Sequence, residues 1–454
     1  MLLRMIRYLA FFLIILFPCS ALSQSKVAEI DSYIKPLIKA NQFYGVILAT
    51  RKGRIIYEKA FGMAQAEHGV PNRIDTRFGI ASVTKGMTQA IAIKLAAEGK
   101  LGLQDRLIKW LPDFPNGEQI TVQMLIDHSS GIPHRGTSEV EETERYTAAD
   151  MVEKAKRATP VFQPGEGRLY SSLGYSVLAR VLEICSAKTF SELLQEYIFL
   201  PAGMKDTVDF NGEMILRRRA QEYYLEPAGI VHAPLKDYSF LIGAGSVFST
   251  ARDVIRFGES VMNGKYGQAV EQALSHEGVF HENGVTNGFR CYVMIDSQKD
   301  FGLVVISNLQ SGADDLLVRD LPNILQDKPV SAPKVPSLKL VRISAERTKE
   351  YVGAYKFEGF TNNITLSSNQ LVSGDYKIFP RRRRSVFSSC RLRNAYFYSQ
   401  CKWRNQGIRV GRSQLQRSWD PAGTKHREVV AEIDPDVKPL ERNRSTTRGR
   451  ARGN

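Results

Sequence analysis

Two apolar-rich segments lie near the start of the chain, at residues 43–50 and 54–61, and Arg51-Lys-Gly53 separates them. Apolar segments on either side of a short glycine-containing turn are typical of a β-hairpin. Residues 288–296 and 301–307 repeat this pattern around Gln298-Lys-Asp300. The pattern therefore predicts strands at both ends of this part of the chain.

The region between these strands has the apolar spacing of helices. Residues 83–98, VTKGMTQAIAIKLAAE, follow helical spacing and stop at Gly99-Lys100. Four further segments predict helices, at residues 147–156, 175–186, 191–199 and 251–262. Strands at both ends with helices between them predict an α+β fold, in which an antiparallel sheet gathers both chain ends and an inserted helical region packs on it.

Composition and charge exclude some classes of function. The 454 residues are 43% hydrophobic and 24% charged, which is typical of a globular protein. Of the formal net charge of +15, residues 381–454 contribute +13, from 16 Arg and 3 Lys against 6 Asp or Glu, and the first 23 residues contribute +2. Residues 24–380 are therefore neutral overall, which argues against a nucleic-acid-binding domain.

The N-terminus has the layout of a secretory signal. Arg4 and Arg7 precede an apolar run at residues 9–17, and small residues follow at Ala21 and Ser23. Nine apolar residues are too few to span a bilayer, which needs about 20. We expect residues 1–23 to be a cleaved signal peptide and the mature protein to be periplasmic or secreted; the alternative is an uncleaved anchor or a core helix.

Cysteine usage gives no support for a metal site. After residue 23 the chain keeps four cysteines, and it has neither a CxxC pair nor an HExxH motif. Four cysteines in a chain of this length are too few for a disulfide framework. We therefore expect no metal and no organic cofactor.

The segment with the clearest chemistry is Phe78-Gly-Ile-Ala-Ser-Val-Thr-Lys85. Ser82 opens the predicted helix, and Lys85 lies one turn later on the same face. A serine hydroxyl becomes a strong nucleophile when a base takes its proton, and a lysine with a lowered pKa can be that base. Taken alone, the pair is better interpreted as a helix-capping serine beside a solvated lysine.

A second segment, Pro164-Gly-Glu-Gly-Arg-Leu-Tyr-Ser-Ser172, delivers Tyr170 and Ser172 just before another predicted helix. A tyrosine hydroxyl that faces Lys85 could carry the proton of Ser82 to a leaving group. Ser172 could hydrogen-bond to the lysine or to the substrate. In isolation, a core tyrosine beside a helix cap is the simpler interpretation.

Taken together, the motifs resemble the serine β-lactamase-like superfamily, which includes class C β-lactamases, penicillin-binding proteins, D-aminopeptidases and esterases. The resemblance spans about residues 27–310. It rests on several segments in register: residues 78–85, Gly99–Asp105 with Trp110-Leu-Pro112, Ile120–Pro133, Tyr170–Ser172, Leu200–Met204 and Gly243–Asp253.

The resemblance implies roles for individual residues. Ser82 would be the acylated nucleophile, Lys85 the general base and Tyr170 the proton relay. The backbone N–H groups of Ser82 and Val285 would form an oxyanion hole. His128, in the segment that resembles the family's LLxHxSGLP stretch, is expected to be structural rather than part of a charge relay.

The third motif departs from the family pattern. Counting back from Gly288-Phe289 places Gly284 at the family's glycine, but Glu282 then falls at the position of a Lys or His. Two interpretations compete. A one-residue bulge would turn His281 into the substrate site, or Glu282 points in and disfavours carboxylate substrates. We expect the bulge, and we place Ser172, His281, Glu282 and Gly284 at the substrate.

The rest of the chain divides into four regions after the signal peptide. Residues 24–325 form the expected serine β-lactamase-like catalytic domain, and residues 326–340 a linker. Residues 341–380 resemble part of a small β appendage found on some relatives. The basic tail, residues 381–454, has little apolar periodicity and is expected to be disordered; contact with anionic envelope polymers or lipids is its functional alternative.

The sequence thus predicts an exported serine hydrolase that acts through an acyl-enzyme on an ester, amide or β-lactam bond. Its substrate would be a small molecule or a D-amino-acid peptide, and no nucleic acid is expected as a partner. The alternative is a catalytically impaired relative that binds cell-wall fragments or a partner protein, which the irregular third motif favours.

Overall fold

In the computed structural model, the described residues are 25–134, 141–210 and 212–335, together with strand segments between residues 352 and 433. The chain divides into two compact units, one up to Ser337 and one from Leu338. The predicted signal peptide, residues 1–23, lies outside the described residues, as does most of the basic tail.

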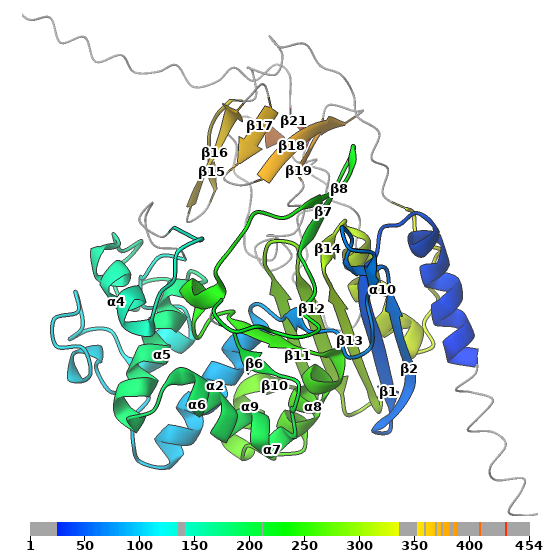
Figure 1. The fold of residues 1–454 in the computed structure, drawn as a ribbon. Helices are drawn as coiled ribbons and strands as arrows, with labels where there is room; N and C mark the ends of the chain where they lie inside the picture. The colour runs from blue at the N-terminus through cyan, green and yellow to red at the C-terminus, as the bar shows by residue number, and fades with distance from the viewer. Residues whose placement is uncertain are drawn as a thin grey trace, which may run out of the picture. The chain divides into compact units, whose positions relative to one another are not determined.

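A six-stranded antiparallel sheet forms the centre of the first unit (Figure 1). An inner strand pair joins the two ends of the unit, with Gly45 opposite Ser307 and Arg51 opposite Phe301. This confirms the expected sheet built from both chain ends. In spatial order the strands are β10 (Ser275–His276), β11 (Val279–Val285), β12 (Arg290–Asp296), β13 (Phe301–Ser307), β1 (Gly45–Arg51) and β2 (Arg54–Phe61).

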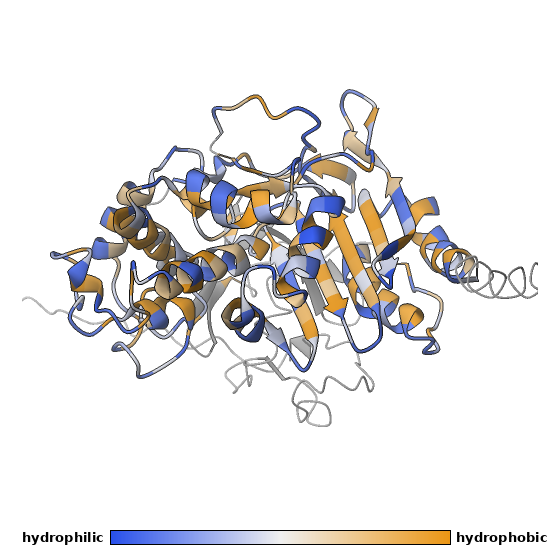
Figure 2. Cartoon of the chain, turned by 90° about the horizontal axis from the view of Figure 1, so that it is seen from below, coloured by the Kyte–Doolittle hydropathy of each residue, from blue (hydrophilic) through white to orange (hydrophobic). Residues whose placement is uncertain are grey.

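Helices cover both faces of this sheet. Successive side chains of a strand point to opposite faces, so Val46 packs in one hydrophobic core and Ile47 in the other. The core around Ile47 also contains apolar residues of a helix over residues 25–39 and of α10 (Ala313–Leu325). All seven residues of β13 are buried, as expected of a strand covered on both faces, and Figure 2 shows strands of the sheet in strongly hydrophobic colours.

The second core belongs to the helical region between the strands. α2 lies between this region and the sheet, because it packs against both α5 and β11 (Figure 1). The helices are α2 (Val83–Ala97), α3 (Val122–Ile126), α4 (Ala148–Arg157), α5 (Ser172–Ser186), α6 (Phe190–Leu194), α7 (Leu200–Ala202), α8 (Ala251–Met262) and α9 (Gln268–Leu274). Shorter helical turns are η1 (Leu107–Lys109), the π-helical η2 (Gln195–Phe199) and η3 (Tyr238–Leu241).

Small sheets link these helices to the central sheet. β5 (Phe78–Gly79) leads directly toward α2 and pairs with β9. The groups, each in spatial order, are β5 with β9 (Val247–Ser249) and β6 (Val208–Asp209); β14 (Leu309–Gln310) with β7 (Tyr223–Glu226) and β8 (Gly229–His232); and β3 (Met63–Gln65) with β4 (Val70–Pro71).

Most predicted elements are present, with shifted ends. The hairpin β1–β2 and the helices α2 and α8 agree with the pattern within a few residues. α5 begins earlier than expected, because the Ser171 side chain accepts a hydrogen bond from Gly174 N and caps the helix at Ser172. The helix expected at 191–199 is instead α6 followed by the π-helical η2. The helices at 25–39 and 313–325 were not predicted.

The second unit contains an antiparallel meander of five strands. Its strands extend past the expected boundary at residue 380, because β18 runs to Arg381 and residues 385–388, Ser-Val-Phe-Ser, form a further strand. The strands are β15 (Gly353–Phe357), β16 (Phe360–Ser367), β17 (Gln370–Ser373), β18 (Tyr376–Arg381) and β19 (Ser385–Ser388), with a separate pair of β20 (Ile408–Arg409) and β21 (Glu432–Ile433). Among the described helices of the whole chain, none has the length and apolar character needed to cross a membrane.

Asn308 joins several of these elements where β13 ends. Its side chain is fully buried, and its Nδ2 donates hydrogen bonds to Gln221 O at 2.8 Å and to Met63 O at 3.0 Å. Its Oδ1 accepts from Asn72 Nδ2 at 3.1 Å. The amide therefore ties the end of β13 to the carbonyl of Met63 in β3 and to the carbonyl of Gln221 in the loop before β7.

Replacing Asn308 tests how much its side-chain amide contributes to the stability of the fold. We expect Asn308→Ala to lower the free energy of unfolding by about 2–4 kcal/mol, because buried carbonyls would lose their donor. Urea unfolding followed by circular dichroism measures the change. Asn263→Ala, at an exposed position after α8, should change it by less than about 0.5 kcal/mol. Equal midpoints for both variants would contradict this role of Asn308.

Candidate active site

Ser82 lies at the start of α2, after a strained turn. Ala81 has φ of +48°, a left-handed conformation that is costly for a residue with a side chain. The turn is held by Ile80 N, which donates to Val247 O at 3.0 Å. The Ser82 side chain makes no capping hydrogen bond to its own helix. Ser82 is partly exposed, and its hydroxyl is available for other partners.

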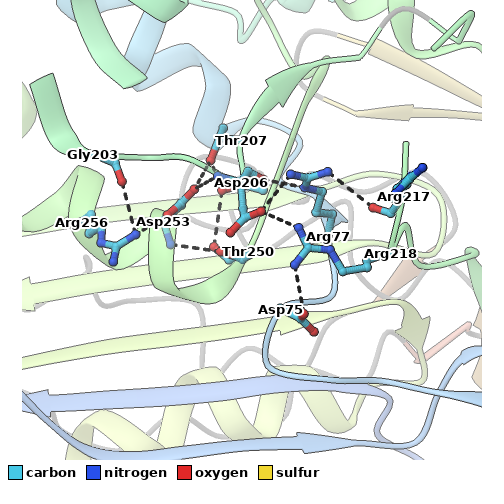
Figure 3. Close-up of polar contacts among 11 residues, drawn as sticks. Asp75, Arg77, Gly203, Asp206, Thr207, Arg217, Arg218, Thr250, Asp253 and Arg256 are labelled. Carbon is cyan, nitrogen blue, oxygen red and sulfur yellow. Dashed lines mark hydrogen bonds and ion pairs between the residues drawn. The ribbon is translucent and has the colours of Figure 1, made fainter. Parts of the chain in front are cut away.

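An ionic network fixes the strand that leads to this turn (Figure 3). Arg77 donates from Nε to Asp206 O and from Nη2 to Asp206 Oδ1, each at 2.9 Å. Arg218 donates to the same carboxylate at 2.6 Å and to Asp75 at 2.9 Å. The buried Asp253 of α8 accepts from Asp206 N at 2.7 Å. β5 is therefore tied to α8 just before the chain reaches Ser82.

Lys85 lies one helical turn from Ser82 and is only 5% exposed. Its Nζ is 3.3 Å from Ser82 Oγ, 3.2 Å from Ser172 Oγ and 2.8 Å from Ala244 O. Burial lowers the pKa of the Lys85 amine to about 7, and the neighbouring Glu282 carboxyl opposes this shift. The alternative interpretation, a solvated lysine, is therefore wrong. The Lys85 amine is buried against the serine hydroxyl and is largely uncharged above pH 7.

Tyr170 completes the group. Its hydroxyl donates to Ser82 Oγ at 2.7 Å, and its ring centre lies 4.8 Å from Lys85 Nζ. Two histidine rings pack against the Tyr170 ring, His128 at 4.5 Å and His134 at 5.4 Å between ring centres. The fold thus places the phenol hydroxyl and the amine on one serine oxygen, although 88 residues separate Tyr170 from Ser82.

His128 supports this arrangement without taking part in a relay. Its Nδ1 accepts a hydrogen bond from Ser171 N at 3.1 Å. Burial, with further contributions from Lys85 and Arg168, lowers the pKa of His128 to about 3, so its ring stays neutral. His134 contributes in a similar way, because its backbone oxygen accepts from Ser172 N at 3.2 Å. Sequence reasoning missed His134, although it directly follows the Ile120–Pro133 segment that resembles the family.

The third motif lies on β11, and the expected bulge there is wrong. β11 pairs with β12 in a continuous register, with His281 opposite Met294 and Glu282 opposite Val293. Because side chains alternate along a strand, His281 faces the other side of the sheet, where its ring lies 5.0 Å from that of Tyr292. Glu282 therefore points toward α2, and its pKa is raised to about 8 by burial.

Gly284 lies against the Ser82 turn. A Cβ on Gly284 would come within 2.1 Å of Ile80 O and 2.9 Å of Ser82 N, so only glycine fits there. Val285 follows directly and ends β11 opposite Arg290. The structure thus brings together Ser82, Lys85, Tyr170, Ser172, Glu282 and Gly284, with Val285 adjoining Gly284, and it leaves His281 outside the site.

A protein-family model described as Beta-lactamase matches residues 30–326, which is more than half of the chain. The chain belongs to the beta-lactamase family. It is similar to a penicillin-binding protein of Bacillus subtilis (strain 168), with 25% identity over 399 residues that cover 77% of this chain and 88% of the relative. It is also 28% identical to Esterase EstB of Burkholderia gladioli over 201 residues, which cover 40% of this chain and 51% of the relative.

Solved structures show the same fold. FmtA from Staphylococcus aureus superposes with a TM-score of 0.59 at 20% identity, over 69% of this chain and 93% of that chain. D-amino acid amidase from Ochrobactrum anthropi SV3 gives a TM-score of 0.58 at 21% identity, over 67% and 97%. As a member of the beta-lactamase family with these relatives, the protein is a serine hydrolase.

Burial of the Lys85 amine has a measurable cost in stability. A lysine with a pKa of about 7 when folded and 10.5 when unfolded binds fewer protons in the folded state between these values, so stability rises with pH across that window. We expect Lys85→Met to be more stable than the natural protein by about 1–3 kcal/mol at pH 7, with lost hydrogen bonds offsetting part of the gain.

Thermal unfolding at pH 7 and near pH 10 measures this effect. The difference between Lys85→Met and the natural protein should shrink at the higher pH, where an unfolded lysine also approaches neutrality. Lys35→Met, on an exposed position of the first helix, should give a small difference that does not change with pH. A pH-independent difference for Lys85→Met would contradict the lowered pKa.

Proposed function

We propose that the protein hydrolyses an ester, amide or β-lactam bond through an acyl-enzyme at Ser82. The observation that carries this proposal is the contact of two groups with one oxygen: Tyr170 OH at 2.7 Å and Lys85 Nζ at 3.3 Å from Ser82 Oγ. A nucleophile within reach of a base, with that base oriented by further groups, is the arrangement that covalent hydrolases use.

The chemistry follows from these positions. The uncharged Lys85 amine takes the proton of Ser82 as its oxygen attacks the substrate carbonyl carbon. Backbone N–H groups of Ser82 and Val285 hold the resulting oxyanion, and the N-terminus of α2 favours its negative charge. Tyr170 passes the proton to the leaving group. Water then attacks the acyl-enzyme by the reverse proton path and frees Ser82.

Among the proposed bonds, we infer that an ester is preferred over an amide. Ser172 stands where the pattern of the family resemblance has Asn, so this position offers no side-chain amide to hold the carbonyl of an amide substrate. The similarity to Esterase EstB and to D-amino acid amidase is consistent with small acyl substrates, including D-amino-acid derivatives. The signal-like residues 1–23 support action in the periplasm or outside the cell, and the basic tail supports contact with anionic polymers or lipids there.

Covalent labelling tests the proposed nucleophile. A fluorescent fluorophosphonate should label the purified protein, because it reacts with activated serines, and Ser82→Ala should lose more than about 90% of the label. Ser191→Ala, at an exposed serine of α6, should keep it. Undiminished labelling of Ser82→Ala would refute the assignment. An unlabelled natural protein would favour the impaired relative that only binds cell-wall fragments or a partner.

The labelling rate should depend on pH through Lys85. Because the base must be uncharged, the second-order rate should rise as pH increases through about 7. Lys85→Ala should lower the rate by roughly a thousandfold and remove this rise. Tyr170→Phe should slow labelling while keeping the midpoint, since the phenol carries the proton but does not set the base. A rate for Lys85→Ala equal to that of the natural protein would exclude Lys85 as the base.

A further inference from the structure

The strand β11 lies beside α2 (Figure 1). Two contacts show how their residues align. Gly284 lies against Ser82 N, and Glu282 lies against Gly86, where an added Cβ would be 3.0 Å from Glu282 Oε1. Residues 82 and 86 are separated by about 6 Å along the helix, and residues 282 and 284 by about 7 Å along the strand. The Glu282 carboxyl therefore lies about one helical turn from the nucleophile, beside Lys85.

This carboxyl group is available to a ligand. Glu282 is partly exposed, and among the described residues no hydrogen bond or ion pair engages its oxygens. The titratable groups whose charges couple to it are Lys85 on α2, Tyr175 on α5 and Cys291 on β12. Lys85 is the only cation among these three, and it must be uncharged to act as a base.

We propose that Glu282 forms a cation subsite, so that the preferred substrates are acyl compounds with an ammonium group about one helical turn from the scissile carbonyl. This inference rests on the proposed acyl-enzyme function. A substrate carboxylate at this position would meet an acidic side chain and would be disfavoured. In the family pattern, this position carries a Lys or His. Here it carries Glu282, so it would select a cationic substrate group.

A bound cation would also help Lys85 to stay unprotonated. Burial raises the pKa of Glu282 to about 8, so a bound ammonium group would favour the ionised form of this carboxyl. Without such a cation, an ionised Glu282 favours the protonated form of Lys85, because opposite charges stabilise each other. An ammonium group of the substrate would supply the counter-ion in place of Lys85. Pairing of Glu282 with the substrate therefore leaves the amine free to lose its proton, so substrate binding and base activation support each other.

Matched esters test the subsite in the full-length protein. One series carries the charge in the acyl half: p-nitrophenyl esters of trimethylammoniobutyrate, of its tert-butyl isostere and of glutarate. A second series of esters carries the charge in the leaving group: acetylthiocholine, its tert-butyl isostere and S-acetylmercaptopropionate. In at least one series, kcat/KM should be about tenfold higher for the cation than for the neutral isostere, and lower still for the anion.

Variants identify the residue responsible. Glu282→Gln should make the cationic and neutral esters equal, and Glu282→Lys should reverse the order in favour of the anion. Glu118→Gln, at an exposed glutamate before α3, should keep the preference of the natural protein. Thermal unfolding and the turnover of the neutral ester show whether each variant is folded.

The outcomes separate this inference from the proposed function. If fluorophosphonate labels Ser82 and the neutral esters are hydrolysed without any preference for the cation in either series, the cation subsite is refuted while the acyl-enzyme stands. A preference for the cation that persists in Glu282→Gln also refutes it. If the protein is not labelled and hydrolyses no ester, the proposed function fails, and the subsite fails with it.

Discussion

An uncharged amine held against a serine hydroxyl inside the protein is the constraint around which this site is built. Lys85 loses its charge because burial removes water, yet it remains close to three oxygens and two aromatic rings. Such burial of a lysine opposes folding, since the amine is protonated in the unfolded chain. The rest of the domain must supply the stability that this site removes.

That stability comes from contacts between segments far apart in sequence. The sheet closes only when β1 pairs with β13, and its two faces are covered by different helices. Around the nucleophile, the ionic network of Arg77, Asp206 and Arg218 holds the strand that precedes the strained Ala81. Local strain and a buried amine persist because surrounding packing and hydrogen bonds determine them.

Charge is what sets the third motif of this chain apart from the pattern that its family resemblance implies. The strand β11 presents an acid, Glu282, beside the base, and Gly86 on the facing helix leaves space for it. The backbone part of the site is unaffected, because Gly284 still packs against the Ser82 turn. Under the proposed cation subsite, a change of one side chain on this strand would alter substrate charge preference without altering the nucleophile, since the two depend on different atoms.

The sequence alone determined what depends on local spacing. Three residues from Ser82 to Lys85 make one helical turn wherever that helix lies, and apolar spacing was enough for the hairpin and for α2 and α8. The motif order that carried the family resemblance also pointed to Tyr170, although no local rule connects it to Ser82.

Only the tertiary structure decided which way the third motif faces. A shift of one residue in strand register exchanges the two faces of a strand. The sequence alone therefore could not decide whether His281 or Glu282 faces the site. The continuous pairing of β11 with β12 placed Glu282 in the site and His281 outside it. The lowered pKa of Lys85 was likewise decided by the fold, because it depends on the exclusion of water by residues distant in sequence.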